Sequence, residues 1–248
     1  PALTGSEAKI AMAEAEAPAS AAVTRSSVAR DVPIPSAPFW GSRIVTDIPV
    51  DDVYRYINDV ALIRGQWRVV KGKLSAEEYD RILRETIMPE YQALKDQVRS
   101  AGLLQPNVVY GYFPCQSGGN DLIIYEPPND GVATVSPIER ARLSFPRQTK
   151  DRQLCISDFF ASVDSGRMDV IAMQLVTVGR AASEHARSLF QADNYKDYLY
   201  FHGLSVESAE ALAELWHQRI RQELGIAYKD APEIKRLFSQ GYQGARYS

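Results

Sequence analysis

The three histidines and two cysteines are the side chains of this chain best suited to metal ligation or nucleophilic catalysis. His185, His202 and His217 show no spacing that would bring them together with carboxylates in a metal site. Cys115 has no base near it in sequence, and Cys155 lies in an apolar context typical of a strand. The sequence pattern supports no Ser/His/Asp triad. We therefore predict no catalytic residue and no metal ligand in this chain.

Two acidic residues stand out for their positions in predicted helices. Asp59 lies near the C-terminal end of one helix, where a carboxylate opposes the helix dipole. Glu210 lies one to two turns into another helix, and a buried carboxylate there would require a cationic partner. Taken alone, each residue also fits an ordinary solvent-exposed helical acid. The residues by themselves leave both interpretations open.

The strongest helix prediction lies in the last third of the chain. Ser205 suits an N-cap and Gly225 suits a C-terminal stop, with acids early and arginines late in the segment. Apolar residues recur there at helical spacing, which predicts one buried face. That face comprises Leu204, Ala209, Leu212, Ala213, Trp216 and Ile220.

The N-terminal half predicts a strand followed by two helices. The strand covers residues 41–49, and Asp51 is expected to cap a helix over residues 52–63. Ser75 and Glu78 form a capping-box pattern for a long helix that ends at Gly102. The Met88–Pro89 pair predicts a kink or break inside that helix.

The middle of the chain predicts several strands joined by turns. Residues 108–113 and 121–125 form a hairpin across a glycine-rich loop at 115–120, which lacks the lysine and following helix of a phosphate-binding loop. We expect a second turn, a further strand, a near-continuously apolar central strand and two more helices. These cover residues 127–131, 141–146, 170–178, 179–191 and 232–238, respectively.

This order of elements predicts an α+β fold with a mainly antiparallel, twisted β-sheet flanked by helices. The glycine-rich signature of a Rossmann-type methyltransferase does not follow a first strand, so that class is disfavoured. Residues 1–38, rich in Ala, Ser, Glu and then Pro, predict an interdomain linker, and residues 39–248 predict one domain. The chain lacks an initiator Met and a signal peptide, so we expect a piece of a longer protein.

Composition and net charge limit the classes of binding partner that we expect. A hydrophobic content of 45% and a charged content of 24% are ordinary for a soluble globular protein. The net charge of −3 gives no reason to expect a nucleic acid or a membrane as partner. Two cysteines fit neither a disulfide framework nor a zinc site, so we expect a cytoplasmic location.

Several blocks in one order carry a resemblance to a known family. YLYFHGLSVESAEALAELWHQRIRQELGI (198–226) and YQGARYS (242–248) resemble the C-terminal activation domain of cobalamin-dependent methionine synthase. RGQW (64–67), VVYGYFPCQ (108–116), FPRQ (145–148) and LCISDFF (154–160) match as well, so the resemblance covers roughly residues 40 to 248. The family motif continues through Gly-Tyr-Pro, and this chain stops before it at Ser248.

The resemblance implies a function for the intact protein. That protein moves a methyl group from methyltetrahydrofolate to homocysteine through cobalamin, in methionine biosynthesis. Its activation domain binds S-adenosylmethionine and presents the methyl group for reductive remethylation of cob(II)alamin. The implied partners are the cobalamin-binding module of the same polypeptide and a flavodoxin-like or other reductase. The folate-, homocysteine- and cobalamin-binding segments are absent from this chain, and zinc belongs only to the absent homocysteine module. We therefore expect no turnover by this chain alone.

The resemblance also implies a binding site. Asp59, or its neighbour Asn58, and Glu210 match the acidic contacts to the amino end of S-adenosylmethionine. Arg246 matches the arginine that holds the carboxylate, and Ser248 a backbone contact to the adenosyl part. Tyr242 and Tyr247 are further candidates for the lining of the site.

An alternative from another class remains open. The chain would then be a non-catalytic docking module on a cobalamin-binding protein that does not bind S-adenosylmethionine. Retention of Asp59, Glu210 and Arg246 favours the binding function over this alternative.

Overall fold

Two compact units make up the chain in the computed structural model, which describes residues 25–128, 137–149, 152–239 and 241–243. Unit 1 falls within residues 1–33, 114–126 and 134–169, and unit 2 within residues 34–113, 127–133 and 170–248. Most of the predicted linker, residues 1–24, and most of the turn predicted at 127–131 lie outside the described residues. None of the helices in the described ranges is both long and apolar enough to cross a membrane.

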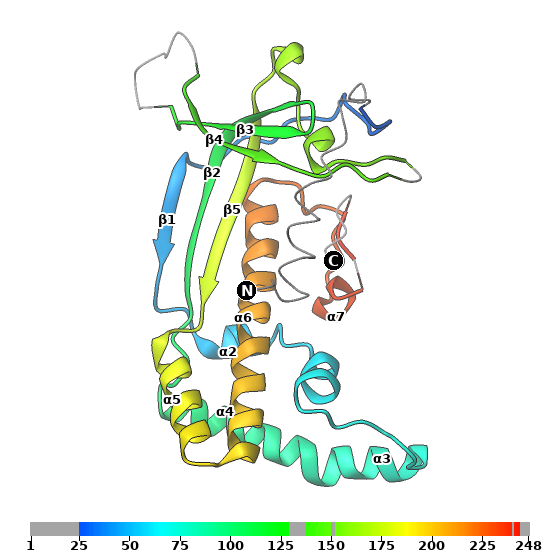
Figure 1. Ribbon diagram of the computed structural model, residues 1–248, viewed down its shortest axis with the longest axis vertical. Coiled ribbons are helices and arrows are strands. Elements are labelled where there is room, and N and C mark those ends of the chain that lie inside the picture. Colours follow the sequence, from blue (N-terminus) through cyan, green and yellow to red (C-terminus); the bar gives the residue numbers. More distant parts are fainter. Residues whose placement is uncertain (1–24, 129–136, 150–151, 240, 244–248) are drawn as a thin grey trace, which may run out of the picture. The chain divides into compact units, whose positions relative to one another are not determined.

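The longest element of unit 2 is helix α6, Tyr195–Glu223. It begins well before Ser205, so the predicted N-cap is wrong: the Ser205 hydroxyl instead donates to the Phe201 carbonyl inside the helix at 2.9 Å. The earlier turns form because Phe201 is buried and because they pack against α5, Arg180–Gln191. The two helices lie side by side in Figure 1. The helix ends as predicted, with Gly225 in the left-handed region at φ 69°.

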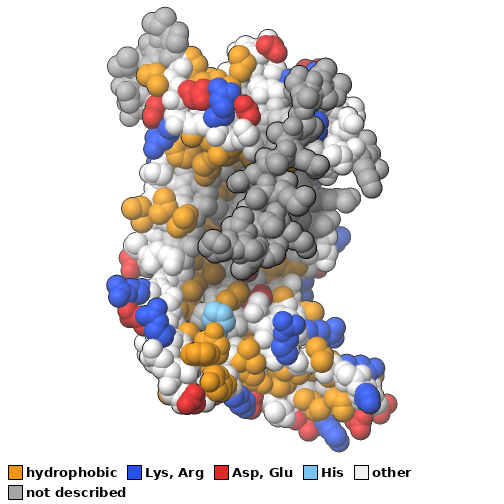
Figure 2. Space-filling model, in the orientation of Figure 1, with side chains coloured by type: hydrophobic (Ala, Val, Ile, Leu, Met, Phe, Trp, Pro, Cys, Tyr) orange, Lys and Arg blue, Asp and Glu red, His pale blue; other side chains and the backbone are white. Residues whose placement is uncertain are grey.

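The buried face of α6 is confirmed for the large residues. Leu204, Leu212, Trp216 and Ile220 are buried, whereas Ala209 and Ala213 are only partly so. This face packs on α5, on the short helix α2, Val50–Tyr54, and on the π-helical segment η1, Ala61–Gln66. Not every apolar side chain of these helices is covered, and Figure 2 shows hydrophobic side chains gathered over the lower helices. Exposed members include Phe190, Tyr195 and Leu199.

The helix predicted over residues 52–63 is wrong in both length and cap. Helix α2 spans only Val50–Tyr54, and its N-cap is Pro49, without a side-chain cap. The chain leaves the helix because Tyr56 and Ile57 both turn into the core. A new helical segment then starts where Asn58 Oδ1 accepts hydrogen bonds from the backbone of Val60 and Ala61, each at 3.2 Å.

The long helix after Ser75 forms with the predicted capping box and the predicted break. Ser75 and Glu78 exchange both bonds of the box. The helix consists of α3, Ala76–Ile82, the π-helical segment η2, Leu83–Ile87, and α4, Met88–Ser100. The π segment directly precedes Met88 and Pro89, where the proline lacks the N–H of a regular helical ladder.

In unit 2, strand β1, Gly41–Val45, pairs antiparallel with the first part of β2, Asn107–Gly118. Strand β5, Asp169–Thr177, also pairs with β2. The prediction that this apolar strand is central is therefore wrong, because β2 is the strand with three neighbours. One face of β5 packs on the core while Leu175 is 67% exposed, so an apolar run here does not mean cover on both faces.

In unit 1, the end of β2 forms a hairpin with β3, Asp121–Tyr125, and β3 pairs with β4, Glu139–Ser144. The predicted loop at 115–120 is shorter than expected, because Cys115 pairs with Ile124 and Gly118 with Asp121. Only two residues are left for the turn. Two 3-10 segments follow, η3, Ile156–Phe159, and η4, Val163–Ser165. The predicted strand at 141–146 corresponds to β4 and the predicted short helix at 232–238 to α7, Ile234–Leu237.

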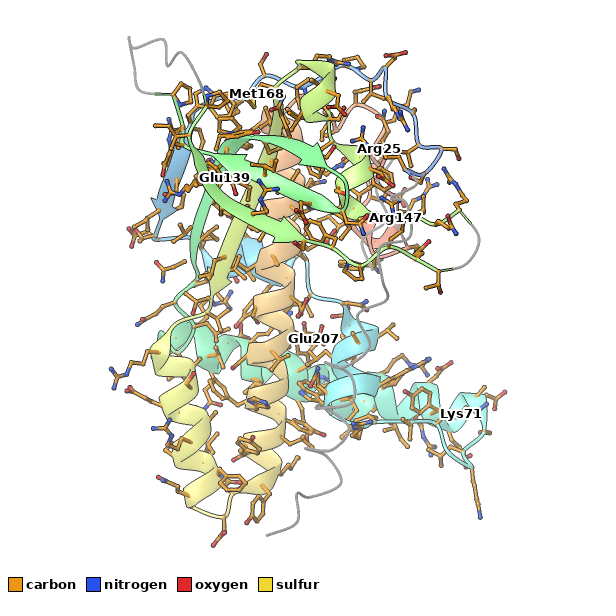
Figure 3. The ribbon with its side chains drawn as sticks, turned by 45° about the horizontal axis from the view of Figure 1, so that its top comes forward. Arg25, Lys71, Glu139, Arg147, Met168 and Glu207 are labelled. Atoms are coloured by element: carbon orange, nitrogen blue, oxygen red, sulfur yellow. The ribbon has the colours of Figure 1, made fainter. Side chains whose placement is uncertain are left out.

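A buried carboxylate organises unit 1. The Asp158 side chain is 1% exposed and accepts two hydrogen bonds from Arg147, at 2.5 and 2.9 Å. The Ser26 backbone N–H donates to it at 3.1 Å, and Arg25 approaches to 4.0 Å. Both arginines are labelled in Figure 3. Hydrogen bonding from Arg147 lowers the pKa of Asp158 well below its usual range.

Candidate functional site

One face of α6 presents three carboxylates to a single cavity of about 310 Å³ in unit 2. Glu207, Glu210 and Glu214 are three and four residues apart, so the helical period places them in one row. Two further walls come from the segment between α2 and η1 and from the region of α7. The lining consists of Tyr56, Asn58, Ala61, Glu207, Glu210, Ala211, Glu214, Leu237 and Phe238.

The approach of η1 to α6 depends on Gly203. A Cβ at this position would lie 2.9 Å from Gln66 Cβ and from Trp67 Cδ1, closer than real Cβ contacts. The Trp67 indole donates to the Tyr200 carbonyl at 3.0 Å and stacks on the Tyr200 ring with centroids 4.4 Å apart. This packing brings Gln66 Nε2 to 3.3 Å from Glu207 Oε1. Figure 3 shows Glu207 on the side of α6 that faces η1.

Two of the three carboxylates are buried with neutral partners. Glu207 and Glu214 are each 7% exposed. Burial raises the pKa of Glu207, with Gln66 opposing the shift, and burial raises the pKa of Glu214, with Tyr242 opposing it. The Tyr242 hydroxyl donates to Glu214. Glu210 is exposed at the cavity edge.

The cavity is therefore acidic. Its described lining contains three glutamates and no Lys or Arg. A buried carboxylate without a cation nearby is costly, and it is stabilised either by a proton or by a positively charged ligand. The arrangement suits a small molecule with one or more cationic groups.

The side chains of Asn58 and Asp59 have different surroundings. Asn58 lines the cavity, whereas Asp59 is exposed and does not belong to the lining. Asp59 is instead a neighbour of Tyr91: burial first, and then the nearby Asp59 carboxylate, raise the pKa of that tyrosine. Consecutive residues at the start of a helical segment point in different directions, so a register error of one residue changes which side chain faces the cavity.

Of the other residues implied by the resemblance, some lie within the described ranges and some outside them. Glu210 lies in the lining. Tyr242 is buried behind the cavity wall, where it contacts the cavity through Glu214. Arg246, Tyr247 and Ser248 lie outside the described residues.

Two of the histidines and both cysteines lie elsewhere, whereas His217 packs edge-on to Tyr242. His185 packs edge-on to Phe201, and His202 stacks on Tyr198. Cys115 and Cys155 are both buried, and burial raises the pKa of the Cys115 thiol. Within the described ranges no three His, Cys, Asp or Glu residues are grouped closely enough to hold a metal ion.

Glu207 and Glu214 were not among the site residues expected from the sequence. One signal was present, because acids spaced by three and four residues share one face of a helix. That signal alone also describes a solvated helix surface, which is the commoner case. Only the packing of η1 and Tyr242 against these acids distinguishes the two.

Comparisons with known proteins agree on one family. The family model described as "Vitamin B12 dependent methionine synthase, activation domain" matches residues 62–248. The methionine synthase of Mycobacterium tuberculosis (strain ATCC 25618 / H37Rv) is 39% identical over 237 residues, which are 90% of this chain and 19% of that protein. The methionine synthase of Mycobacterium leprae (strain TN) is 38% identical over the same shares. The chain thus spans about one fifth of the length of these relatives.

A solved structure supports the fold. The "Crystal Structure of the MetH Reactivation Domain bound to AdoHcy" matches with a TM-score of 0.72 and 24% identity, over 88% of this chain and 67% of that chain. The predicted α+β class with an antiparallel sheet and helices is confirmed by this likeness. On the evidence of the family model and the two methionine synthases, the chain belongs to the family of activation domains of vitamin B12-dependent methionine synthase.

Proposed function

We propose that this chain binds S-adenosylmethionine in the acidic cavity beside α6. The observation that carries the proposal is the row Glu207, Glu210 and Glu214, which faces one cavity whose described lining holds no basic residue. S-adenosylmethionine carries an ammonium and a sulfonium, so its cations complement these carboxylates. The cavity volume of about 310 Å³ falls in the range of small-molecule sites. The related reactivation domain bound to AdoHcy supports the same ligand class.

Each side chain has a separate role in this proposal. Glu210 contacts the amino end of the ligand at the open edge, and the buried Glu207 and Glu214 supply negative charge deeper in the wall. Asn58 takes the position first assigned to Asp59, because it is the residue of the pair that lines the cavity. Its amide Oδ1 already accepts two backbone bonds, so the remaining amide nitrogen is a donor for the ligand.

Residues 246–248 also contribute to the proposed site. Arg246 offers a planar guanidinium for the ligand carboxylate, which a lysine would not match in geometry. Ser248 supplies a backbone contact to the adenosyl part, and Tyr247 is a further lining residue. The assignments of Arg246 and Ser248 rest on the resemblance of the YQGARYS segment to the family motif.

For the intact protein we propose the role of the family. When bound, S-adenosylmethionine supplies a sulfonium-activated methyl group for the reductive remethylation of cob(II)alamin held by the cobalamin-binding module. The electron comes from a flavodoxin-like or other reductase, in the cytoplasm. The residues of this chain bind and orient the methyl donor and supply the charge around it. Methyltetrahydrofolate and homocysteine are substrates of the longer methionine synthase.

Calorimetric titration of S-adenosylmethionine tests the proposal. We expect binding to the wild-type chain, or to a version continued through the family's Gly-Tyr-Pro motif. Glu210→Gln and Arg246→Ala should each weaken the binding free energy by about 1–3 kcal/mol, since each loses a charge-assisted contact. Glu184→Gln is the matched control, because Glu184 is an exposed acid paired with Arg180 on α5.

The contrary outcome is equally clear. Unchanged affinity in both Glu210→Gln and Arg246→Ala would remove the site assignment. A well-folded extended chain that binds no S-adenosylmethionine would instead support a docking module on a cobalamin-binding protein.

A further inference from the structure

The acidic row of α6 continues into a second row that holds the C-terminal strap, residues 241–243. Glu214, His217 and Arg221 follow one another at helical spacing. Glu214 belongs to both rows, because it lines the cavity and accepts a hydrogen bond from Tyr242 of the strap. One helix face therefore serves the cavity and the strap together.

The buried ion pair of Arg221 and Asp230 hydrogen-bonds the backbone of the strap residue Gln243. Arg221 Nε and Nη2 lie 2.7 Å from the two carboxylate oxygens of Asp230, and the side chains are 6% and 5% exposed. Arg221 Nη2 also donates to the Gln243 carbonyl at 2.9 Å. The Gln243 N–H donates to Asp230 Oδ1 at 2.7 Å. Both backbone groups of one strap residue are thus bound by one pair.

Tyr242 links the strap to the cavity wall through its contact with Glu214. The Arg221 guanidinium lies 5.1 Å from the centre of its ring, and His217 packs edge-on at 4.8 Å. The hydroxyl donates to Glu214, which lines the cavity. The position of Gln243 therefore fixes the neighbouring Tyr242, and Tyr242 fixes the orientation of Glu214.

The strap also fits closely at its start. A Cβ on Gly241 would lie 2.6 Å from the Arg236 carbonyl oxygen and 2.9 Å from Ala231 Cβ, so only glycine fits there. The Ala231 N–H donates to the Gly241 carbonyl at 2.8 Å, and the Gly241 N–H donates to the Arg236 carbonyl at 2.9 Å. Gly241 and Gln243 are therefore held by hydrogen bonds to their backbones, and Tyr242 by a hydrogen bond from its side chain.

We propose that Arg221 and Asp230 are positioning residues of the ligand site. They fix the strap, and through Tyr242 they fix Glu214 in the cavity wall, without contacting the ligand themselves. A buried ion pair is often replaceable by apolar residues at no cost in stability, so stability alone does not account for this pair, whereas the geometry it imposes on the strap does. The inference rests on the proposed binding of S-adenosylmethionine.

The test separates positioning from folding. The double variant Arg221→Met/Asp230→Leu removes both charges and keeps apolar volume, so no buried charge is left unpaired. We expect it to keep the thermal midpoint of the wild type, to bind S-adenosylmethionine at least tenfold more weakly, and to exchange the amide hydrogens of the strap faster. Tyr242→Phe, which cuts only the last link, should show a smaller loss of affinity. Arg180→Ala/Glu184→Ala, an exposed pair on α5, is the control.

A second variant keeps the inference testable if the double variant does not fold. Asp230→Asn retains an acceptor for the Gln243 N–H but loses the ion pair, and it should give an intermediate loss of affinity. Unchanged affinity in a folded variant whose strap exchanges faster would overturn the inference. Unchanged strap exchange would overturn it as well. If neither the wild-type chain nor the version continued through Gly-Tyr-Pro binds S-adenosylmethionine, the proposed function is refuted, and strap exchange then decides the positioning role alone.

Discussion

Asp158 in unit 1 and the pair Glu207 and Glu214 in unit 2 are buried carboxylates with opposite surroundings. In unit 1, Asp158 is held by two bonds from Arg147, a backbone N–H and the nearby Arg25. In unit 2, Glu207 and Glu214 are almost as buried, and the described bonds to them come from an amide and a phenol. The pKa of Asp158 is lowered, whereas the pKa values of Glu207 and Glu214 are raised.

The difference separates architecture from ligand binding. A carboxylate paired with a guanidinium already has its charge neutralised inside the protein, so it stabilises the fold and has little left to offer a ligand. A carboxylate buried beside neutral donors keeps a charge that a proton or a cation must neutralise. The following predictions test this distinction, beginning with the largest effect.

Removing the paired carboxylate should damage the fold. Asp158→Ala leaves the Arg147 side chain, only 12% exposed, without its carboxylate partner, and we expect a loss of about 3–5 kcal/mol in the free energy of unfolding. Urea unfolding measures this loss. Arg147→Met/Asp158→Leu should recover most of it, because the guanidinium is removed together with its partner and the nearby Arg25 still reaches solvent. A loss below about 1 kcal/mol for Asp158→Ala would contradict the structural role.

Displacing a neutral partner should affect both stability and binding. Gly203→Ala forces Gln66 and Trp67 away from α6, because the added Cβ has no room. We expect a loss of about 1–3 kcal/mol in stability, as for other overpacked sites, together with weaker binding at Glu207. Thermal unfolding and calorimetric titration measure the two effects. Gly65→Ala, where a Cβ meets nothing within 4 Å, is the matched control.

Removing an unpaired carboxylate should damage binding alone. Glu214→Gln keeps an acceptor for the Tyr242 hydroxyl and removes a desolvated charge, so stability should stay within about 1 kcal/mol of the wild type. The affinity for S-adenosylmethionine should fall about tenfold, or about 1.4 kcal/mol. Equal losses of stability in Glu214→Gln and Asp158→Ala would erase the contrast between the two units.

Lowering the pH should affect the carboxylates beside neutral donors and the arginine-paired Asp158 at different pH values. We expect a smaller and more gradual effect than that of the substitutions above. The raised pKa values of Glu207, which faces Gln66 and Glu210, and of Glu214, which faces Tyr242 and Tyr56, lie above the ordinary 4.5. Affinity for the cationic ligand should therefore fall as the pH drops through these raised values. The contribution of these two glutamates to stability has the opposite sign: it is present at low pH and lost as the pH rises through their folded pKa values.

Asp158 should respond last. Its folded pKa is lowered, so its contribution to stability is fully present above its ordinary pKa and is lost only as the pH falls through the folded value. Calorimetric titrations with S-adenosylmethionine at a series of pH values, with unfolding followed in parallel, should show that binding is lost at a higher pH than the one at which unit 1 unfolds. The double variant Glu207→Gln/Glu214→Gln should flatten the pH dependence of binding.

The sequence predicted best where local chemistry decides the structure. The capping box at Ser75, the break at Pro89 and the helix end at Gly225 all formed, because each depends on residues a few positions apart. The N-cap at Ser205 and the single helix over residues 52–63 failed, because tertiary packing overrode the local signal. Aromatic residues before Ser205 extend α6, and the burial of Tyr56 breaks α2.

The candidate site was predictable only in part for the same reason. Glu210 was found through the resemblance, and it lies in the cavity lining. The choice between Asp59 and Asn58 required the direction of a side chain, which depends on where a helical segment begins. Glu207 and Glu214 required knowledge of burial, which a row of helical acids does not reveal.

The hydrogen bond between Tyr242 and Glu214 gives the unlabelled protein an internal optical probe. The ultraviolet absorption of a phenol shifts when its acceptor gains or loses charge, so a cation placed beside Glu214 would alter the spectrum of Tyr242. A difference spectrum that is present in the wild type and missing in Tyr242→Phe would report occupancy of the cavity. Ligand binding, protonation and strap release would then each be visible without an added dye.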